Sequence, residues 1–150
     1  MNAREFLDVA NELVAGMDEG HWRSGVSRAY YAAFHVARKL MEKAGFAVPQ
    51  NEGAHAYLGM RLSNAKHPEV EEAGRGLEDS RRARNRADYR IDHHFEETQA
   101  NSDVMRANDV LRLLEEATAL PTVLDQITLA MRAYERDVLR DVTWRAPSSP

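Results

Sequence analysis

Apolar residues recur at three- and four-residue intervals along most of the chain, the spacing that places them on one face of an α-helix. The first such segment starts at Asn2, which can form a capping box with Glu5. Its apolar face continues to Met17, before a stop near Gly20. A longer segment runs from residue 22 to Gly45, where a glycine can take the left-handed conformation that often ends a helix. The first third of the chain therefore predicts two amphipathic helices.

Further helices follow, separated by short breaks. The stretch around Pro49 shows no periodicity, and a shorter helix is predicted across residues 55–62. Later helices are predicted over residues 68–91, over residues 104–117 and after Pro121, which either begins the last helix or kinks a continuous one. The short connections favour antiparallel neighbours, and no strand-like alternation occurs. The sequence thus predicts an all-α fold, an antiparallel bundle of five to six helices.

Composition narrows the class of protein. A length of 150 residues with 43% hydrophobic content suits one domain, expected over residues 1–145, with a frayed tail over residues 146–150. No apolar run of about 18 residues and no signal-peptide pattern is present, so we expect a cytoplasmic protein without a membrane span. The lack of cysteine excludes disulfides, thiolate zinc sites and a cysteine nucleophile. Glycine-loop and serine-hydrolase motifs are also absent, and we expect no cofactor and no bound metal.

Charge is distributed unevenly along the chain. The net charge is −4, so a nucleic acid would be attracted only by a local basic patch. The densest cluster of basic residues lies in SRRARNRADYR, residues 80–90, and consists of Arg81, Arg82, Arg84, Arg86 and Arg90. Arg84 has an acid, Asp88, at the spacing for a helical ion pair, whereas Arg86 has none placed symmetrically around it. An unpaired guanidinium invites an anion such as phosphate.

Other polar groups share this neighbourhood. Asn85, Tyr89 and His93 follow one another at four-residue steps, and Arg86 lies two turns before His93. Metal-free RNA cleavage requires such groups: a cation for the phosphoryl oxygens, and a proton donor and acceptor. A purely structural interpretation also fits, in which Tyr89 packs in the core and the arginines are solvated. The segment DHHFEE, residues 92–97, has metal-ligating residue types, but a turn expected there would scatter them.

The second predicted helix carries a polar stripe opposite its apolar face. The stripe consists of Ser27, Tyr31, His35 and Arg38, which project from one side of the helix. We expect this stripe to face water or a partner. His35 and His55 each lack a second ligand one turn away, which favours a structural or interface role for both.

Two segments together carry a family resemblance. Residues 27–38, SRAYYAAFHVAR, and residues 84–89, RNRADY, resemble a small prokaryotic branch of the HEPN domain family, and the helix order matches over most of residues 1–120. The resemblance implies a helical bundle that homodimerises, with the motif helices of two protomers meeting in a cleft. Members usually bind or cleave RNA. The stripe residues expected at the dimer interface are Ser27, Tyr31 and His35.

The resemblance also assigns roles within residues 80–93. The candidate catalytic residues are Arg84, Tyr89 and His93; the candidate RNA- or anion-binding residues are Arg81, Arg82, Asn85, Arg86 and Arg90; and Asp88 supports the motif. Catalytic members carry R-x(4 to 6)-H, but here Tyr89 stands at the position of the histidine. With an ordinary pKa of about 10, tyrosine is a poor general base near neutrality. A literal R-x6-H pattern does occur from Arg86 to His93.

Three hypotheses follow. The first is a metal-independent endoribonuclease of a toxin-antitoxin or defence system, with activity weakened or lost through Tyr89. The second is a non-catalytic HEPN module that binds RNA, a nucleotide or a protein partner. The third is a protein partner of a nucleotidyltransferase, which would modify Tyr89.

Overall fold

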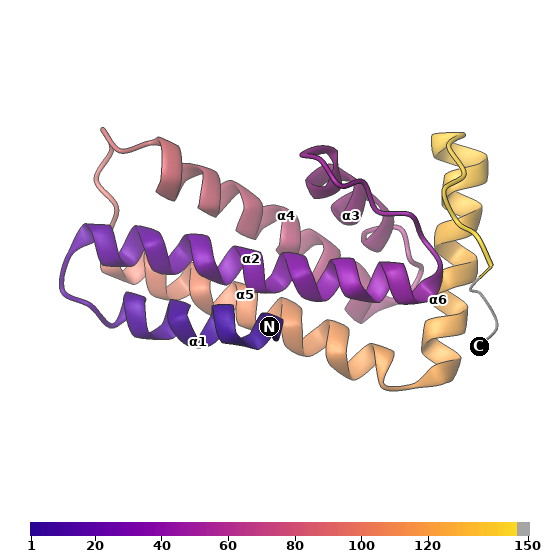
Figure 1. Cartoon of the computed structure of the whole chain (residues 1–150), viewed down its shortest axis with the longest axis horizontal. Coiled ribbons are helices and arrows are strands. Elements are labelled where there is room, and N and C mark those ends of the chain that lie inside the picture. The colour runs from indigo at the N-terminus through magenta and orange to yellow at the C-terminus, as the bar shows by residue number, and fades with distance from the viewer. Residues whose placement is uncertain (147–150) are drawn as a thin grey trace.

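The computed structural model describes residues 1–146, which form six α-helices and one short π-helix (Figure 1). In chain order these are α1 (Ala3–Val14), α2 (Glu19–Ala44), α3 (Gly53–Leu62), α4 (Pro68–Tyr89), α5 (Glu97–Thr118), α6 (Pro121–Tyr134) and the π-helix η1 (Glu135–Leu139). Within residues 1–146 the only β-type pairing is an isolated bridge between Phe46 and Trp144. The predicted all-α bundle is confirmed. Of the predicted tail, residues 147–150 lie outside the described part of the chain.

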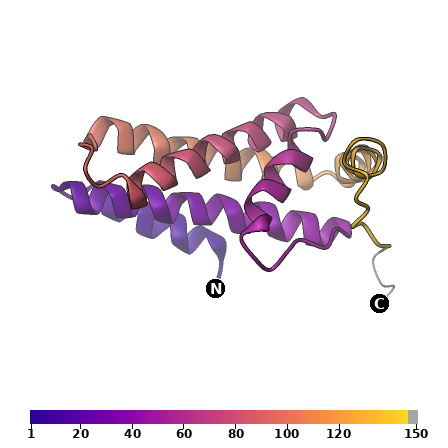
Figure 2. The ribbon, with the colours of Figure 1, turned by 90° about the horizontal axis from the view of Figure 1, so that it is seen from above.

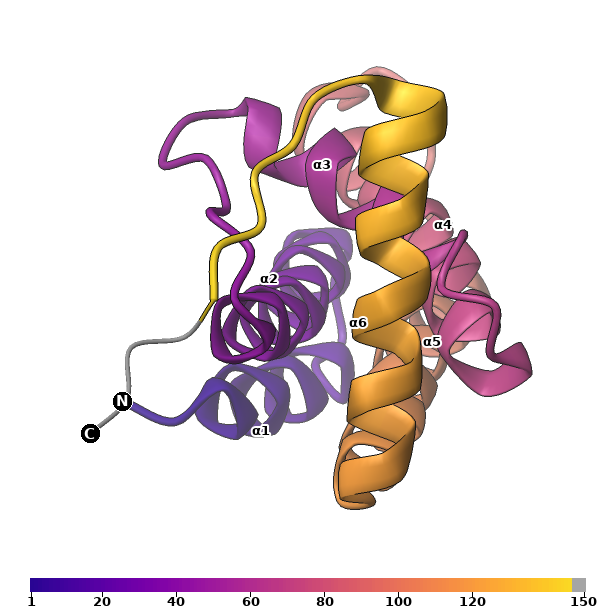
Figure 3. The ribbon, with the colours of Figure 1, turned by 90° about the vertical axis from the view of Figure 1, so that its right-hand side faces the viewer.

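Four helices form the body of the bundle. α2 packs against α1, α4 and α5, and α4 also packs against α5 and α3. The pair α1 and α2 makes one layer and the pair α4 and α5 the other, as the view from above shows (Figure 2). α6 crosses the end of this body, where it contacts α5 and α3 (Figure 3). None of the helices within residues 1–146 is both long enough and apolar enough to cross a membrane.

The boundary between the first two helices differs from the prediction. α1 ends at Val14, and α2 begins after Asp18, whose carboxylate accepts a hydrogen bond of 2.9 Å from the His21 N–H. Met17, predicted on the apolar face, lies in the intervening turn and is 94% exposed. The connection between the two helices has four residues, about as many as one turn of α-helix. The apolar residues therefore kept their helical spacing across it, and the sequence pattern did not show that α1 ends at Val14.

The other helix ends follow residues with special backbone properties. The capping box of Asn2 and Glu5 is present at the start of α1. Gly45 ends α2 with φ of 108°, in the left-handed region that favours glycine. Pro121 begins α6 and does not kink a continuous helix, which resolves the two alternatives left by the sequence.

The core is centred on α2, whose buried face is rich in alanine. These small side chains let neighbouring helices approach closely, and Gly25 lies at a close approach to α1. A Cβ at Gly25 would lie 3.0 Å from the Ala10 carbonyl oxygen and 3.1 Å from the Val14 nitrogen. Larger buried side chains, such as Tyr30 of α2 and Leu111 of α5, fill the space between the layers.

Residues 135–146 fold back over the bundle and are called here the C-terminal segment. The carboxylate of Glu135, fully buried, accepts hydrogen bonds from Arg61 Nε at 2.7 Å and from the backbone N–H groups of Thr143 and Trp144. The indole of Trp144 donates to the Ala44 carbonyl oxygen at 2.8 Å. Burial raises the pKa of Glu135, but its hydrogen bonds outweigh burial and hold that pKa below the ordinary value.

Candidate nucleic-acid interface

The arginine-rich segment forms the last turns of α4. The helix ends at Tyr89, and Arg90 is the first residue beyond it. Residues 91–96 then form the loop to α5. Ile91, predicted to continue the apolar face, lies in this loop and is 78% exposed. The motif is therefore helical up to Tyr89 and irregular beyond it.

A pocket of about 840 Å³ lies against this end of α4 and the loop that follows. Six residues from the sequence-predicted site line it: Arg82, Asn85, Arg86, Tyr89, Arg90 and His93. The remaining lining residues are Arg23, His94, Phe95, Glu96 and Gln99. Four arginines thus face one carboxylate in a chain whose net charge is −4. This pocket is a local basic patch of the kind that nucleic-acid binding would need.

Two of the four arginines in the pocket are paired with acids. Arg23 pairs with Glu19 at 2.8 Å. Arg82 forms a surface ion pair with Asp79 at 3.0 Å. The guanidinium groups of Arg86 and Arg90 have no acidic partner within residues 1–146. Two cations are therefore free to meet an anion that enters the pocket.

Tyr89 lines the pocket and is largely exposed. Its side chain is 72% exposed, so the structural interpretation that placed it in the core is wrong. His93 does not continue the four-residue stack of Asn85 and Tyr89, because the helix has already ended. The loop nevertheless brings His93 to the pocket, where its ring lies 3.9 Å from the carboxylate of Asp92.

Arg84 lies on a different side of α4 from Arg86. Two residues apart, they point about 200° apart around a helix. Arg84 faces α2, with its Cζ atom 5.4 Å and 5.5 Å from the ring centroids of Tyr30 and Tyr31, and also 5.9 Å from that of Tyr89. It does not line the pocket. The structure therefore separates the two motif arginines.

The ion pair predicted between Arg84 and Asp88 is not formed. Asp88 instead accepts a hydrogen bond of 3.1 Å from the hydroxyl of Ser27 on α2. Arg84 has no ion-pair partner within residues 1–146, and its buried Nε has no hydrogen-bond acceptor there. The pair was predicted from helical spacing alone. Ser27, which takes the place of Arg84 as the partner of Asp88, comes from a different helix.

Sequence reasoning missed Arg23, which fixes the end of α4. Its side chain, on α2, reaches across to the last turn of α4 and the loop. There it donates to the carbonyl oxygens of Arg86, Ala87, Arg90 and His93. The last carbonyls of a helix have no partner within the helix, so these hydrogen bonds satisfy them. Arg23 therefore acts as the cap for α4 from outside that helix.

Glu19 also holds this end of α4 in place. The Glu19 carboxylate pairs with Arg23 at 2.8 Å and accepts a hydrogen bond of 3.0 Å from the Phe95 backbone N–H. We call Glu19 and Arg23 together the clamp. The hydrogen bond from Arg23 lowers the pKa of Glu19, and the one from Phe95 adds to this effect. The four-residue spacing of Glu19 and Arg23 predicts an ion pair between them. It does not predict that this pair also binds the backbone of α4 and of the following loop.

The polar stripe predicted at a dimer interface is only partly accessible. Ser27 is 5% exposed, and its hydroxyl donates a hydrogen bond to Asp88. The expectation that Ser27 faces water or a partner is therefore wrong. Tyr31 is half-buried, and His35 is exposed and stacks on the Phe6 ring at 5.5 Å. Of the three residues predicted at a dimer interface, Tyr31 and His35 are therefore the accessible ones.

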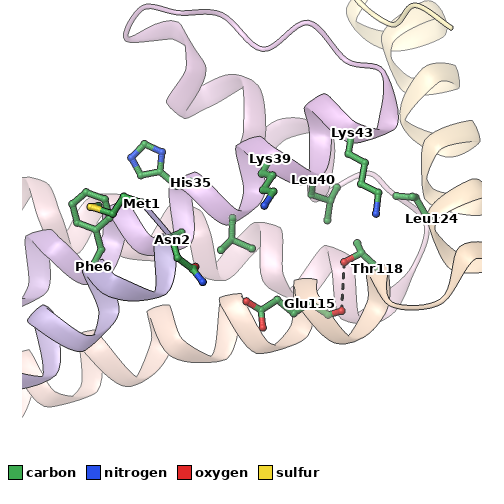
Figure 4. Close-up of a pocket in the computed structure, with 12 residues that line it drawn as sticks. Met1, Asn2, Phe6, His35, Lys39, Leu40, Lys43, Glu115, Thr118 and Leu124 are labelled. Atoms are coloured by element: carbon green, nitrogen blue, oxygen red, sulfur yellow. Dashed lines mark hydrogen bonds between the residues drawn. The ribbon is translucent and has the colours of Figure 1, made fainter. Parts of the chain in front are cut away.

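A second pocket, of about 740 Å³, lies between the N-terminus, α2 and the end of α5 (Figure 4). Lys39 and Lys43 extend from α2 on one side, and Glu115 lies on the α5 side. Phe6 and Leu40 contribute apolar walls. Apart from His35, no residue of the sequence-predicted site lines this pocket, so it belongs to a separate part of the surface.

The histidines of the loop do not form a metal site. Within residues 1–146 no three His, Asp or Glu side chains converge in a way that would hold a metal ion. His94 lies 3.3 Å from Glu19, and His93 turns to Asp92.

One comparison with known proteins gives a match. The model of the HEPN domain family matches residues 1–117, which include α1 to α4, nearly all of α5 and every residue that lines the arginine pocket. No curated protein and no solved structure matches the chain significantly. α6 and the C-terminal segment lie beyond the matched residues.

Proposed function

Because the chain belongs to the HEPN domain family, we propose that it binds RNA in the pocket at the carboxyl end of α4. The observation that carries this proposal is the gathering of four arginines around the exposed Tyr89. Phosphate contacts supply much of the affinity of proteins for nucleic acids, and exposed aromatic rings stack on unpaired bases. Single-stranded RNA, or the loop of an RNA hairpin, offers both kinds of contact.

Each group in the pocket has a defined role in this proposal. Arg86 and Arg90 bind backbone phosphates, since no acid of residues 1–146 competes for them. Tyr89 provides a stacking surface for a base. Asn85 offers an amide donor and acceptor to a base edge. The clamp keeps the loop in place, so the pocket is formed before RNA arrives.

We place this pocket in a cleft between two copies of the chain, with Arg84 and Tyr89 of each copy near the interface. Dimerisation is common in the HEPN family, and the exposed parts of Tyr31 and His35 offer a surface for it. Light scattering at micromolar concentration should give about twice the chain mass of 17.0 kDa. A mass of one chain would contradict the composite cleft but not RNA binding itself.

RNA cleavage without a metal is the second candidate function. Its specific support is His93, whose imidazole lines the same pocket as Arg86 and is the side chain most often used for general acid–base catalysis. Tyr89 stands where catalytic members have histidine, which favours binding over cleavage. Incubation of labelled RNA with chelator tests this: cleavage that is lost in Arg84→Ala and His93→Ala would make the protein a ribonuclease.

A protein partner is the third candidate. Tyr89 is exposed enough to be modified by a nucleotidyltransferase-type enzyme. Mass spectrometry after incubation with such an enzyme and a nucleotide tests this. A nucleotide adduct on Tyr89 would favour this alternative. The toxin-antitoxin or defence setting and the cytoplasmic location stay predictions from the sequence.

The main test is fluorescence anisotropy with a short labelled RNA, chelator present and the salt concentration varied. Arg86→Gln should weaken binding roughly fivefold or more, because a charge-assisted hydrogen bond to phosphate is lost. It should also lower the slope of log affinity against log salt by about one. Arg75→Gln is the matched control, since Arg75 is exposed on the same helix but outside the pocket. Equal affinity of both variants and the unchanged chain would overturn the proposed site.

A further inference from the structure

Arg84 is a buried cation without an anion. Its side chain is 8% exposed, no carboxylate within residues 1–146 pairs with it, and its buried Nε has no acceptor there. The rings of Tyr30, Tyr31 and Tyr89 lie 5.4 to 5.9 Å from its Cζ atom. They attract the positive charge but are too distant to accept a hydrogen bond. A buried charge in this state is costly unless a partner arrives from outside the chain.

The nearby acids do not neutralise Arg84. Asp88 accepts a hydrogen bond from Ser27. Glu78 lies 3.9 Å from Arg81, and one of its buried carboxylate oxygens has no hydrogen-bond partner within residues 1–146. Arg84, Arg81 and Glu78 all act electrostatically on Tyr30, so two cations face one carboxylate on this side of α4 and a positive charge remains.

His55 of α3 adds a second polar group beside the same tyrosine. Its Nδ1 atom is hydrogen-bonded to the hydroxyl of Tyr30, and the two ring centroids are 5.6 Å apart. Burial raises the pKa of Tyr30, so the hydroxyl keeps its proton at neutral pH. That hydrogen has no other acceptor than His55 within residues 1–146, which makes Tyr30 the donor and Nδ1 the acceptor.

The hydrogen bond from Tyr30 sets the tautomer of His55. Burial lowers the pKa of His55, and the positive charges of Arg84 and Arg81 lower it further, while Glu52 acts weakly in the opposite direction. The imidazole is therefore neutral near pH 7. A neutral imidazole that accepts at Nδ1 carries its hydrogen on Nε2. His55 thus presents an N–H donor, not a lone pair, on the side away from Tyr30.

We propose that Arg84 and His55 form a phosphate-binding site between α2, α3 and α4, with the guanidinium as the charge and His55 Nε2–H as a second donor. Both residues lie against Tyr30, which orients the histidine and contacts the arginine. A guanidinium fork together with a separate N–H suits a tetrahedral oxyanion, which has acceptor oxygens in several directions. The site lies on the side of α4 away from Arg86, so it is separate from the arginine pocket.

Only the source of the phosphate depends on the proposed function. If the chain binds RNA, a backbone phosphate of that RNA occupies the site. If it does not, the occupant is free phosphate or the phosphate of a nucleotide. The three sources share one chemistry and can be supplied separately.

The test uses NMR of the ¹⁵N-labelled full chain. Long-range correlations of the imidazole should show the Nε2–H tautomer for His55. Addition of inorganic phosphate should shift the resonances of His55 and of the Arg84 Nε–H, and should raise the pKa of His55, because a bound anion favours the imidazolium. A nucleoside monophosphate and an RNA without terminal phosphates are then titrated in the same way to identify the source.

Matched variants separate this site from a purely structural role. Tyr30→Phe should abolish the tautomer preference of His55, whereas Tyr31→Phe, which removes a hydroxyl from the adjacent ring, should leave it unchanged. His55→Leu should weaken phosphate binding about tenfold, while His55→Gln, whose amide can take the place of Nε2–H, should retain most of it. Circular dichroism checks that each variant is folded.

Three results would overturn the proposal. They are an Nδ1–H tautomer of His55, equal phosphate affinity of His55→Leu and the unchanged chain, and no shift of His55 with any of the three ligands. RNA binding that is lost in Arg86→Gln but never moves His55 would leave the proposed function standing without this site. Phosphate binding at His55 without any RNA binding would support this site and contradict the proposed function.

Discussion

Replacement of Glu135 by glutamine should strongly destabilise the fold. The change keeps the shape of the side chain and removes its charge, so Arg61 is left buried without an anion. Both side chains are almost inaccessible, at 4% for Arg61 and 0% for Glu135, and the Nε–carboxylate distance is 2.7 Å. Removal of one partner of a buried ion pair typically costs about 3–5 kcal/mol. For a chain of this size that corresponds to a fall in Tm of roughly 6–20 °C.

Thermal and urea unfolding followed by circular dichroism measure this loss. Asp137→Asn is the control, because Asp137 is exposed two residues further on and pairs with Arg136 at the surface. Its Tm should stay unchanged. Arg61→Met combined with Glu135→Gln should be less destabilising than the sum of the single changes, since neither charge is then left alone. A Tm of Glu135→Gln equal to that of Asp137→Asn would refute the reasoning.

The same carboxylate predicts how stability depends on pH. Although burial raises it, the pKa of folded Glu135 lies below the ordinary value of 4.5 because of hydrogen bonds from Thr143 and Arg61. The contribution of Glu135 is therefore complete above about pH 4.5 and is lost as the pH falls through the folded pKa. The unchanged chain should lose Tm more steeply than Glu135→Gln below pH 4.5. Parallel curves would contradict this assignment.

Three further changes test other parts of the structure. Arg23→Lys cannot hold four carbonyl oxygens at once, so hydrogen exchange across residues 90–95 should become faster and RNA affinity should fall; unchanged exchange would argue against the clamp. Tyr89→Ala should weaken RNA binding about tenfold while Tyr89→Phe should retain it, because stacking needs only the ring; equal losses in anisotropy would point to the hydroxyl instead. Gly25→Val should lower Tm by several degrees, since a Cβ there meets the Ala10 carbonyl at 3.0 Å, and an unchanged melting curve would mean that the two helices separate freely.

The helices were predictable where one residue determines the backbone. Gly45 ends α2 and Pro121 starts α6 for reasons that belong to glycine and proline themselves. The break between α1 and α2 was predicted too late, near Gly20 instead of after Val14, because the intervening turn is about as long as one turn of helix. The π-helix was also missed, and its wider turns shift the phase of the apolar pattern so that Val138 is 65% exposed.

The site was predictable as a segment but not as an arrangement of side chains. Spacing along one helix correctly brought Asn85 and Tyr89 to the same pocket. The pairing of Arg84 with Asp88 failed, since the competing partner, Ser27, comes from a helix that lies about 60 residues earlier in the sequence. Arg23 was missed for the same reason. The sequence alone does not show which backbone carbonyl oxygens on another helix an arginine side chain will reach.

The buried contact between Arg61 and Glu135 also has a consequence for synthesis on the ribosome. The two residues are 74 positions apart, so α3 is made long before its acid is available. Until Glu135 leaves the ribosome, Arg61 has to stay in water, and α3 cannot settle fully on its neighbours. The residues that match the family model therefore emerge first as an incompletely closed body. The C-terminal segment, which is made later, completes it.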